Sequence, residues 1–255
     1  MQRSDLDALA AELYAAVHTG TPGDVELVLR ACEGGRRVLE LGCGEGRIAR
    51  QLAEAGHEVI GIDLDEARLE LGRARAEELS APARARLDLR VGDMRAIQLD
   101  RPVSRVVIAH STIYCLRSDD EVRAMLRGVR AALVPEGRLV IDAYAADPFH
   151  GALDPADEDP FEEVAQVDVG GRTWRVLERS DWDRDAQTLV ARYRHEPIED
   201  GEAIETTIEH RYLLVEQLLG LLQDEGFAPL VLAGGFDGRP YDDDAEQLIV
   251  IAERT

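Results

Sequence analysis

The sequence predicts an α/β fold in which a mostly parallel β-sheet carries helices on both faces. The first half alternates short apolar runs with longer amphipathic stretches, which is the pattern of successive βαβ units. A glycine-rich bend follows the first apolar run, where a buried strand would turn into a helix. After Asp142 the apolar runs alternate with polar residues instead, which predicts an antiparallel insertion.

The parallel part is expected to contain five strands joined by helices. The strands are expected at residues 36–41, 59–62, 87–91, 105–109 and 138–142. The connecting helices are expected at residues 46–55, 65–79 and 119–133. Two more helices, 6–17 and 25–31, precede the first strand, and Asp24 is expected to cap the second of them. Both could cover one edge of the sheet.

The second half is expected to insert a separate β structure into this domain. Residues 147–160 are acidic and interrupted by proline, which favours a connection. Four antiparallel strands are expected at residues 163–169, 173–181, 188–195 and 203–212, followed by a helix at 215–225 and strands at 228–232 and 247–252. We therefore expect a cofactor-binding domain formed by residues 1–146 and 213–255, with the leading helices as its cover. Residues 147–212 would form an insertion that covers the acceptor and mediates a homodimer.

Composition excludes several classes of partner. The chain of 255 residues carries 29 basic and 51 acidic residues, a net charge of -22, which repels nucleic acid and anionic membranes. No segment approaches the length of a membrane span, and the amino terminus lacks the apolar core of a secretory signal. The three cysteines are scattered without a C-x-x-C pair, which predicts neither a disulfide framework nor a metal site and favours a reducing cytoplasm.

The glycine-rich bend has the chemistry of a ligand site. In VLELGCGEG, residues 38–46, Gly42 and Gly44 permit close approach of a ligand to the backbone. The helix that begins near Gly46 points its free N–H groups toward the same place, which suits a pyrophosphate or a carboxylate. The dinucleotide fingerprint has a further glycine where Arg47 stands, so the sequence departs from the usual NAD site.

Two acidic residues follow the next two strands. Asp63 ends the second strand, where a carboxylate can accept both hydroxyls of a ribose. Asp93 ends the third strand, where it can accept from an adenine amino group while Met94 lies against the ring. Together with the bend, these residues predict a site for an adenosine-containing ligand.

At this point the chain resembles a known family. VLELGCGEGRIA, VIGIDLD and VGDM resemble the cofactor site of class I S-adenosylmethionine-dependent methyltransferases, and VIAHSTIYCL and LVPEGRLVIDAY resemble its later blocks. The resemblance covers residues 36–144, and residues 210–255 are similar to the family's last helix and strand pair. It implies a Rossmann-like, seven-stranded sheet whose last strand is antiparallel and lies between the fifth and sixth. It also implies S-adenosylmethionine as methyl donor and S-adenosylhomocysteine as product.

The resemblance assigns roles to individual residues. Those implied at the cofactor are Tyr14, Glu40, Gly42, Gly44, Asp63, Leu64, Asp93, Met94, Ala109 and His110. Glu40 and the glycines would hold the methionine end, and Ala109 and His110 would flank the transferring methyl. Small-molecule methyltransferases, such as amino-sugar N,N-dimethyltransferases and glycine N-methyltransferase-like enzymes, are the most similar relatives. They commonly carry histidine where this chain has Cys115, so His110 is a catalytic candidate in its own right rather than an equivalent.

The predicted reaction is methyl transfer to a nitrogen or oxygen of a small molecule by in-line displacement. It needs mainly placement of the acceptor and exclusion of water. Tyr14 and His110 are the candidates for assisting loss of a proton from the acceptor. Further acceptor contacts are expected from Tyr114, His210, Arg211 and Tyr212.

Three alternatives remain. An NAD-dependent oxidoreductase would share the bend and the ribose acid. A nucleic-acid methyltransferase would be expected to carry an Asn- or Asp-Pro-Pro-Tyr/Phe block where this chain reads Ala109-His110-Ser111-Thr112. A protein that binds the cofactor but does not catalyse methyl transfer would have the same glycines and acidic residues.

Overall fold

The computed structural model describes residues 3–151 and 160–255 and divides the chain into two compact units. The larger unit consists of Gly20–Pro148 and Leu213–Thr255, and the smaller one of Met1–Thr19 and Phe149–Tyr212. Each unit has its own sheet.

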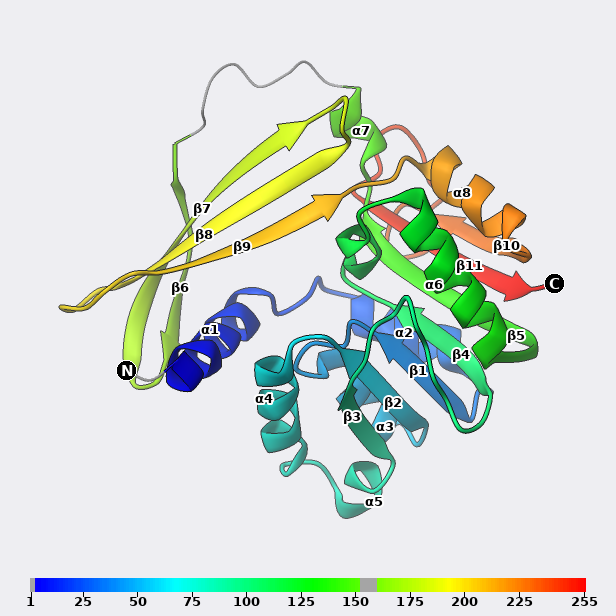
Figure 1. Cartoon of the computed structure of the whole chain (residues 1–255), viewed down its shortest axis with the longest axis horizontal. Coiled ribbons are helices and arrows are strands. Elements are labelled where there is room, and N and C mark those ends of the chain that lie inside the picture. The colour runs from blue at the N-terminus through cyan, green and yellow to red at the C-terminus, as the bar shows by residue number, and fades with distance from the viewer. Residues whose placement is uncertain (1–2, 152–159) are drawn as a thin grey trace. The chain divides into compact units, whose positions relative to one another are not determined.

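The larger unit is built on a seven-stranded sheet in the order β10-β11-β5-β4-β1-β2-β3 (Figure 1). Its strands are β1 (Arg37–Leu41), β2 (Glu58–Asp63), β3 (Leu87–Val91), β4 (Val103–Ile108), β5 (Leu133–Tyr144), β10 (Phe227–Ala233) and β11 (Gln247–Arg254). Strands β1 to β5 pair in parallel, and β11 pairs antiparallel with both β5 and β10. This is the predicted fold, including the antiparallel last strand between the fifth and sixth.

Helices cover both faces of this sheet. The helices of this unit are α2 (Asp24–Cys32), α3 (Arg47–Glu54), α4 (Glu66–Ala76), α5 (Ala81–Arg84), α6 (Asp119–Ala132) and α8 (Val215–Asp224), with a short 3-10 turn η1 (Thr112–Cys115). The short helix α7 (Asp147–His150) spans the point where the chain passes from the larger unit to the smaller one. Helices α2 and α3 lie on one face, and α6 and α8 on the other (Figure 1). Apolar side chains of α2 and α3, among them Val28 and Leu52, are fully buried with those of the central strands. This packing fixes the carboxyl end of β1, where the glycine bend begins.

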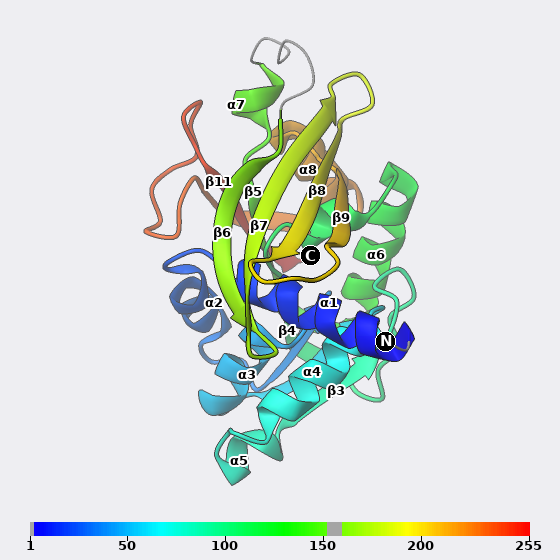
Figure 2. The ribbon, with the colours of Figure 1, turned by 90° about the vertical axis from the view of Figure 1, so that its left-hand side faces the viewer.

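The smaller unit is a four-stranded antiparallel sheet with one helix. Its strands are β6 (Glu162–Val169), β7 (Arg172–Asp183), β8 (Thr188–Pro197) and β9 (Ile204–Arg211), paired in that order. Helix α1 (Arg3–Val17) packs against this sheet (Figure 2), where Leu13 is buried with Val169 and Trp174. The expected meander is therefore present, with β7 and β8 longer than expected.

Several features differ from the sequence expectation, among them β5, which begins at Leu133 rather than at residue 138. Helix α1 belongs to the smaller unit rather than to the cofactor-binding domain, because its apolar stripe is buried by the antiparallel sheet. Asp24 is the first residue of α2, whose N-cap is Gly23, and its side chain binds Arg47 instead of capping. In the predicted connection at 147–160, Asp147–His150 forms α7, and residues 152–159 lie outside the described part.

Among the described helices none is long and apolar enough to cross a membrane.

Candidate functional site

The glycine bend joins β1 to α3 through three residues in the left-handed region. Gly42, Gly44 and Gly46 have φ angles of 65°, 54° and 71°. A Cβ on Gly42 would lie 2.2 Å from the Thr112 methyl, so only glycine fits there. A Cβ on Gly44 would have no described atom within 4 Å, which shows that open space lies beside the bend at this residue. The two glycines therefore have different roles: Gly42 accommodates η1, and Gly44 leaves room for a ligand.

Glu40 lies beneath this bend in an unusual state for a carboxylic acid. The side chain is buried, and burial raises its pKa to about 8, although Arg47 and the Ala49 backbone N–H lower it. Its Oε2 atom is buried without a hydrogen-bond partner in the described part of the chain. A buried polar atom without a partner is rare and calls for an explanation, such as a bound group.

Asp63, at the end of β2, is fixed by the backbone around it. One carboxylate oxygen accepts from the Gly44 N–H at 2.7 Å and the other from the Asp65 N–H at 2.9 Å. Leu64, next in the chain, is 64% exposed. The carboxylate keeps lone pairs for additional donors, as ribose recognition requires.

Asp93, at the end of β3, has a partner that the sequence did not predict. The Arg95 guanidinium donates to both of its carboxylate oxygens and also to Glu121 at the start of α6. The hydrogen bonds from Arg95 hold the pKa of Asp93 below its ordinary value. A cavity of about 330 Å³ lies beside Asp93 and is also lined by Ile62 and Gly92. Met94 follows Asp93 and is half-buried.

His110 lies in a tight turn just beyond β4, after the buried Ala109. Its backbone N–H donates to Asp142 Oδ2 at 3.1 Å, and Asp142 is the buried acid near the end of β5. His110 as a residue is exposed, but partial removal of its imidazole from water, followed by the positive charge of Arg47, lowers its pKa. Burial raises the pKa of Asp142 to about 6. The sequence analysis missed Asp142, whose only signal was its place at the end of a strand.

Arg47 explains why this chain departs from the dinucleotide fingerprint. Its guanidinium forms two hydrogen bonds with the buried Asp24, at 2.6 and 3.2 Å. Asp24 also accepts from the Thr21 and Val25 N–H groups. Arg47 thus ties the start of α2 to the start of α3, a contact that glycine could not make.

Two predicted acceptor contacts lie in protein interiors instead. Tyr114 is fully buried, and its hydroxyl donates to the carbonyl oxygens of Tyr144 and Leu213. Tyr212 is also buried, with its ring against Phe149 and its hydroxyl 3.0 Å from His150 Nδ1. Aromatic side chains so placed support the fold, and a contact of either residue with the acceptor stays a prediction. Cys115 is an exposed free thiol at the end of η1.

The other predicted residues belong to the smaller unit. Tyr14 lies on α1, with its ring centroid 4.2 Å from that of His18 one turn later. His210 and Arg211 end β9. The structure describes the two units separately, so the roles of these residues toward a cofactor stay predictions.

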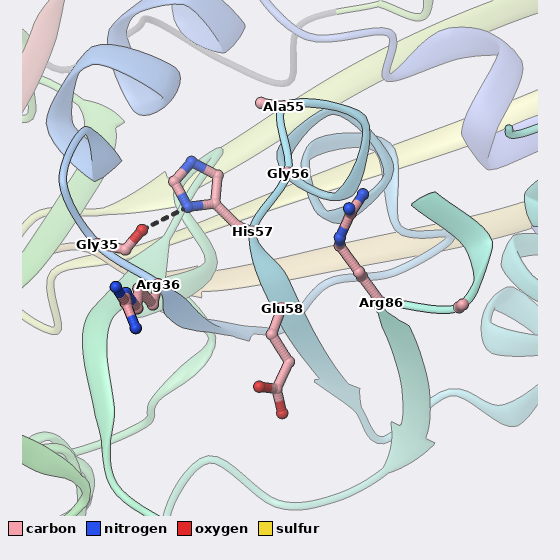
Figure 3. A pocket seen from close by; sticks show the side chains of 8 residues that line it. Gly35, Arg36, Ala55, Gly56, His57, Glu58 and Arg86 are labelled. Carbon is pink, nitrogen blue, oxygen red and sulfur yellow. Dashed lines mark hydrogen bonds between the residues drawn. The ribbon is translucent and has the colours of Figure 1, made fainter. Parts of the chain in front are cut away.

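The second cavity lies away from these residues. It measures about 660 Å³ and is lined by Gly35, Arg36, Ala55, Gly56, His57, Glu58, Ala85 and Arg86 (Figure 3). The His57 ring is held there by Gly35, whose carbonyl oxygen lies 2.9 Å from Nδ1. These residues surround the amino ends of β1, β2 and β3, whereas ligands of open α/β sheets bind at the carboxyl ends.

The carboxyl-end residues fit an adenosine-containing cofactor with an amino-acid tail. Gly44 leaves space at the bend, Asp63 offers acceptors for hydroxyls, and Glu40 offers an unpaired oxygen. A model of a methyltransferase domain matches residues 38–137, which span β1 to the first part of β5. The chain is 25% identical over 226 residues to the cypemycin N-terminal methyltransferase of a Streptomyces species, covering 86% of this chain and 84% of that one.

The chain is thus similar to known methyltransferases over most of its length. It is also 27% identical over 199 residues to a dTDP-3-amino-3,6-dideoxy-alpha-D-glucopyranose N,N-dimethyltransferase of Streptomyces fradiae, covering 75% of this chain and 72% of that one. The solved structure of the CcbJ methyltransferase from Streptomyces caelestis matches 93% of this chain and 98% of that chain, with a TM-score of 0.77 and 25% identity.

Proposed function

We propose that this chain is an S-adenosylmethionine-dependent methyltransferase that transfers a methyl group to an amine nitrogen of a small molecule. The observation that carries the proposal is His110, an imidazole in the turn after β4 whose pKa is held below its ordinary value by burial and by the positive charge of Arg47. The amino-sugar relative is an N,N-dimethyltransferase by name, and the cypemycin relative is named as an N-terminal methyltransferase, which together support an amine as acceptor.

The larger unit would hold the donor. Gly42 and Gly44 would lie against the methionine end, with Glu40 beneath it, and Asp63 would accept from the ribose hydroxyls. Leu64 and Met94 would lie against the adenine, and Asp93 would face its amino group while Arg95 fixes the carboxylate. When bound, S-adenosylmethionine supplies a methyl group on a positively charged sulfur. The protein then needs to place the nucleophile in line and exclude water.

The acceptor amine must lose a proton before it can attack. A neutral His110 can accept that proton directly or through a water molecule. A hydroxyl acceptor has a much higher pKa than an ammonium group and would need a stronger base, which favours nitrogen. The smaller unit would cover the acceptor, with Tyr14, His210 and Arg211 as its candidate contacts.

A mass-spectrometric screen tests this proposal. The protein is incubated with S-adenosylmethionine and three matched panels: amino sugars, peptides with free amino termini, and phenols or sugars that lack an amine. The expected result is a gain of one or two methyl groups on an amine, with S-adenosylhomocysteine formed in step. Methylation of the amine-free panel alone would overturn the choice of nitrogen.

The proposal extends to assembly and compartment. The edge strand β6 carries Val164, which is 49% exposed, and Phe161 just before it is 38% exposed. Open edges with apolar residues need a partner, so we propose a homodimer formed by the smaller unit.

The three cysteines are free thiols, which supports a reducing cytoplasm as the place of the reaction.

A further inference from the structure

The turn that carries His110 contains two consecutive residues in the left-handed region. His110 has a φ angle of 52° and Ser111 of 62°, although neither is glycine. Such a conformation costs of order 1 kcal/mol or more for each residue with a side chain. Strain of this kind persists only where surrounding contacts over-determine it.

Asp142 supplies two of those contacts. Its Oδ2 atom accepts from the His110 N–H at 3.1 Å, and its backbone carbonyl accepts from the Ser111 N–H at 2.9 Å. The Ser111 hydroxyl in turn accepts from the Tyr144 N–H at 3.0 Å. Both residues with positive φ angles in the turn after β4, His110 and Ser111, are therefore hydrogen-bonded to the end of β5.

The Asp142 side chain itself is not needed for strand pairing. β5 pairs with β4 and β11 through its backbone. Asp142 is only 3% exposed, and this burial disfavours the ionised carboxylate and raises its pKa. An apolar residue would fill this place at lower cost. The bond to the His110 N–H is what the carboxylate provides.

We propose that Asp142 is a positioning residue, which holds the strained turn so that His110 faces the transferring methyl group. This inference rests on the proposed function, in which His110 receives the proton of the amine. The same turn continues into Thr112, whose methyl group fills the place of a side chain on Gly42. Asp142 thus also keeps η1 against the glycine bend.

Three variants separate positioning from other roles. Asp142→Ala removes the acceptor of the His110 N–H, whereas Asp142→Asn keeps an oxygen in the same place and removes the charge. Asp88→Asn, an exposed acid on β3, serves as the control. If the Ala variant does not fold, Asp142→Ser replaces it, because its hydroxyl lies one bond nearer the backbone than a carboxylate oxygen.

The first readout needs no acceptor. NMR titration of the His110 ring should give a pKa below the ordinary value in wild type, Asp142→Asn and the control. In Asp142→Ala the ring leaves the protein surroundings and Arg47, so its pKa should rise toward about 6.5. Asp24 opposes Arg47 in all variants alike. An unchanged His110 titration in Asp142→Ala would overturn the inference, whatever acceptor is found.

The second readout uses the acceptor identified by the screen. Asp142→Ala should lower kcat about 10- to 100-fold and leave the dissociation constant of S-adenosylmethionine within about threefold. Asp142→Asn should keep at least about a third of the wild-type kcat and the same pH profile. Equal loss in the Ala and Asn variants would mean that the charge itself acts, and would overturn positioning. Failure to methylate any amine, with the NMR result as expected, would contradict the proposed function alone.

Discussion

At the scale of single residues, the larger unit buries two acids near strand ends in addition to Asp24, which is paired with Arg47. Glu40 and Asp142 both lie near the carboxyl ends of their strands, and burial raises both pKa values, to about 8 and about 6. Burial of an acid without a counter-charge destabilises the ionised form. Residues kept at such a cost are candidates for function rather than for stability.

Glu40 therefore makes the stability of the protein depend on pH. Between its ordinary pKa near 4.5 and its folded pKa of about 8, the folded state binds more protons than the unfolded state. The contribution of Glu40 is thus fully present below pH 4.5 and is lost as the pH rises through 8. We expect the melting temperature of Glu40→Gln to be several degrees above that of the wild-type protein at pH 8.5. At pH 4.5 the two melting temperatures should be equal. Thermal melts without cofactor across this range check the prediction. A constant difference at every pH would contradict it.

Asp63 gives a prediction about the cofactor alone. Its oxygens are oriented by the Gly44 and Asp65 N–H groups. Replacement by alanine should weaken S-adenosylmethionine binding by roughly 1 to 3 kcal/mol, the loss expected when hydrogen bonds to a charged acceptor disappear. Isothermal titration measures it, with Asp88→Asn as the control. An unchanged dissociation constant would remove Asp63 from the site.

At the scale of elements, the turn from β1 to α3 shows how one motif serves two purposes. Gly42 is required by the side chain of Thr112, which comes from the turn after β4. Gly44 is favoured by its φ angle of 54° but not by packing, because the place of its missing side chain is open in the described structure. Packing determines the first glycine, and we propose that ligand approach determines the second.

A matched pair of substitutions tests this distinction. Gly42→Ala should destabilise the protein by about 2 to 4 kcal/mol, since the added methyl meets Thr112 and the φ angle is unfavourable. Gly44→Ala should cost only about 1 kcal/mol of stability from its φ angle and should weaken cofactor binding at least about tenfold. Denaturant unfolding and cofactor titration of both variants provide the two measurements. The reverse pattern would exchange the two roles.

At the scale of the whole molecule, charge and sheet edges determine what the protein associates with. The net charge of -22 opposes contact with nucleic acid and anionic membranes. The same charge opposes self-association unless an apolar surface compensates. The exposed Phe161 and Val164 at the β6 edge supply such a surface.

We expect a homodimer in solution that depends on this edge. Light scattering should give about twice the monomer mass, and Val164→Lys should lower the mass toward the monomer, because a charge on an edge strand blocks pairing. Val231→Lys tests the other exposed apolar edge, strand β10 of the larger unit, and should leave the mass unchanged, whereas a lower mass in this variant would move the dimer contact to β10. A monomer at working concentration in the wild type would refute the dimer.

Much of the fold could be predicted from local patterns. Strand β3 was expected with its observed bounds, because its apolar run is short and flanked by polar residues. Helix α4 was expected to begin after Asp65, whose side chain does accept from the Arg68 N–H. Asp24 misled the same reasoning, since an acid at a helix start has the same sequence signature whether it caps the helix or binds a distant arginine.

The sequence by itself determined the parallel sheet, the glycine bend and the acids that follow β2 and β3, because each depends on residues close together in the chain. Only the tertiary structure decided that Tyr114 is buried, that Arg95 pairs with Asp93, and that Asp142 holds the His110 turn. Asp142 and His110 are 32 residues apart, and no local pattern relates them. Pairing of β4 with β5 brings them together, so the chemistry of this site follows from strand order as much as from its motifs.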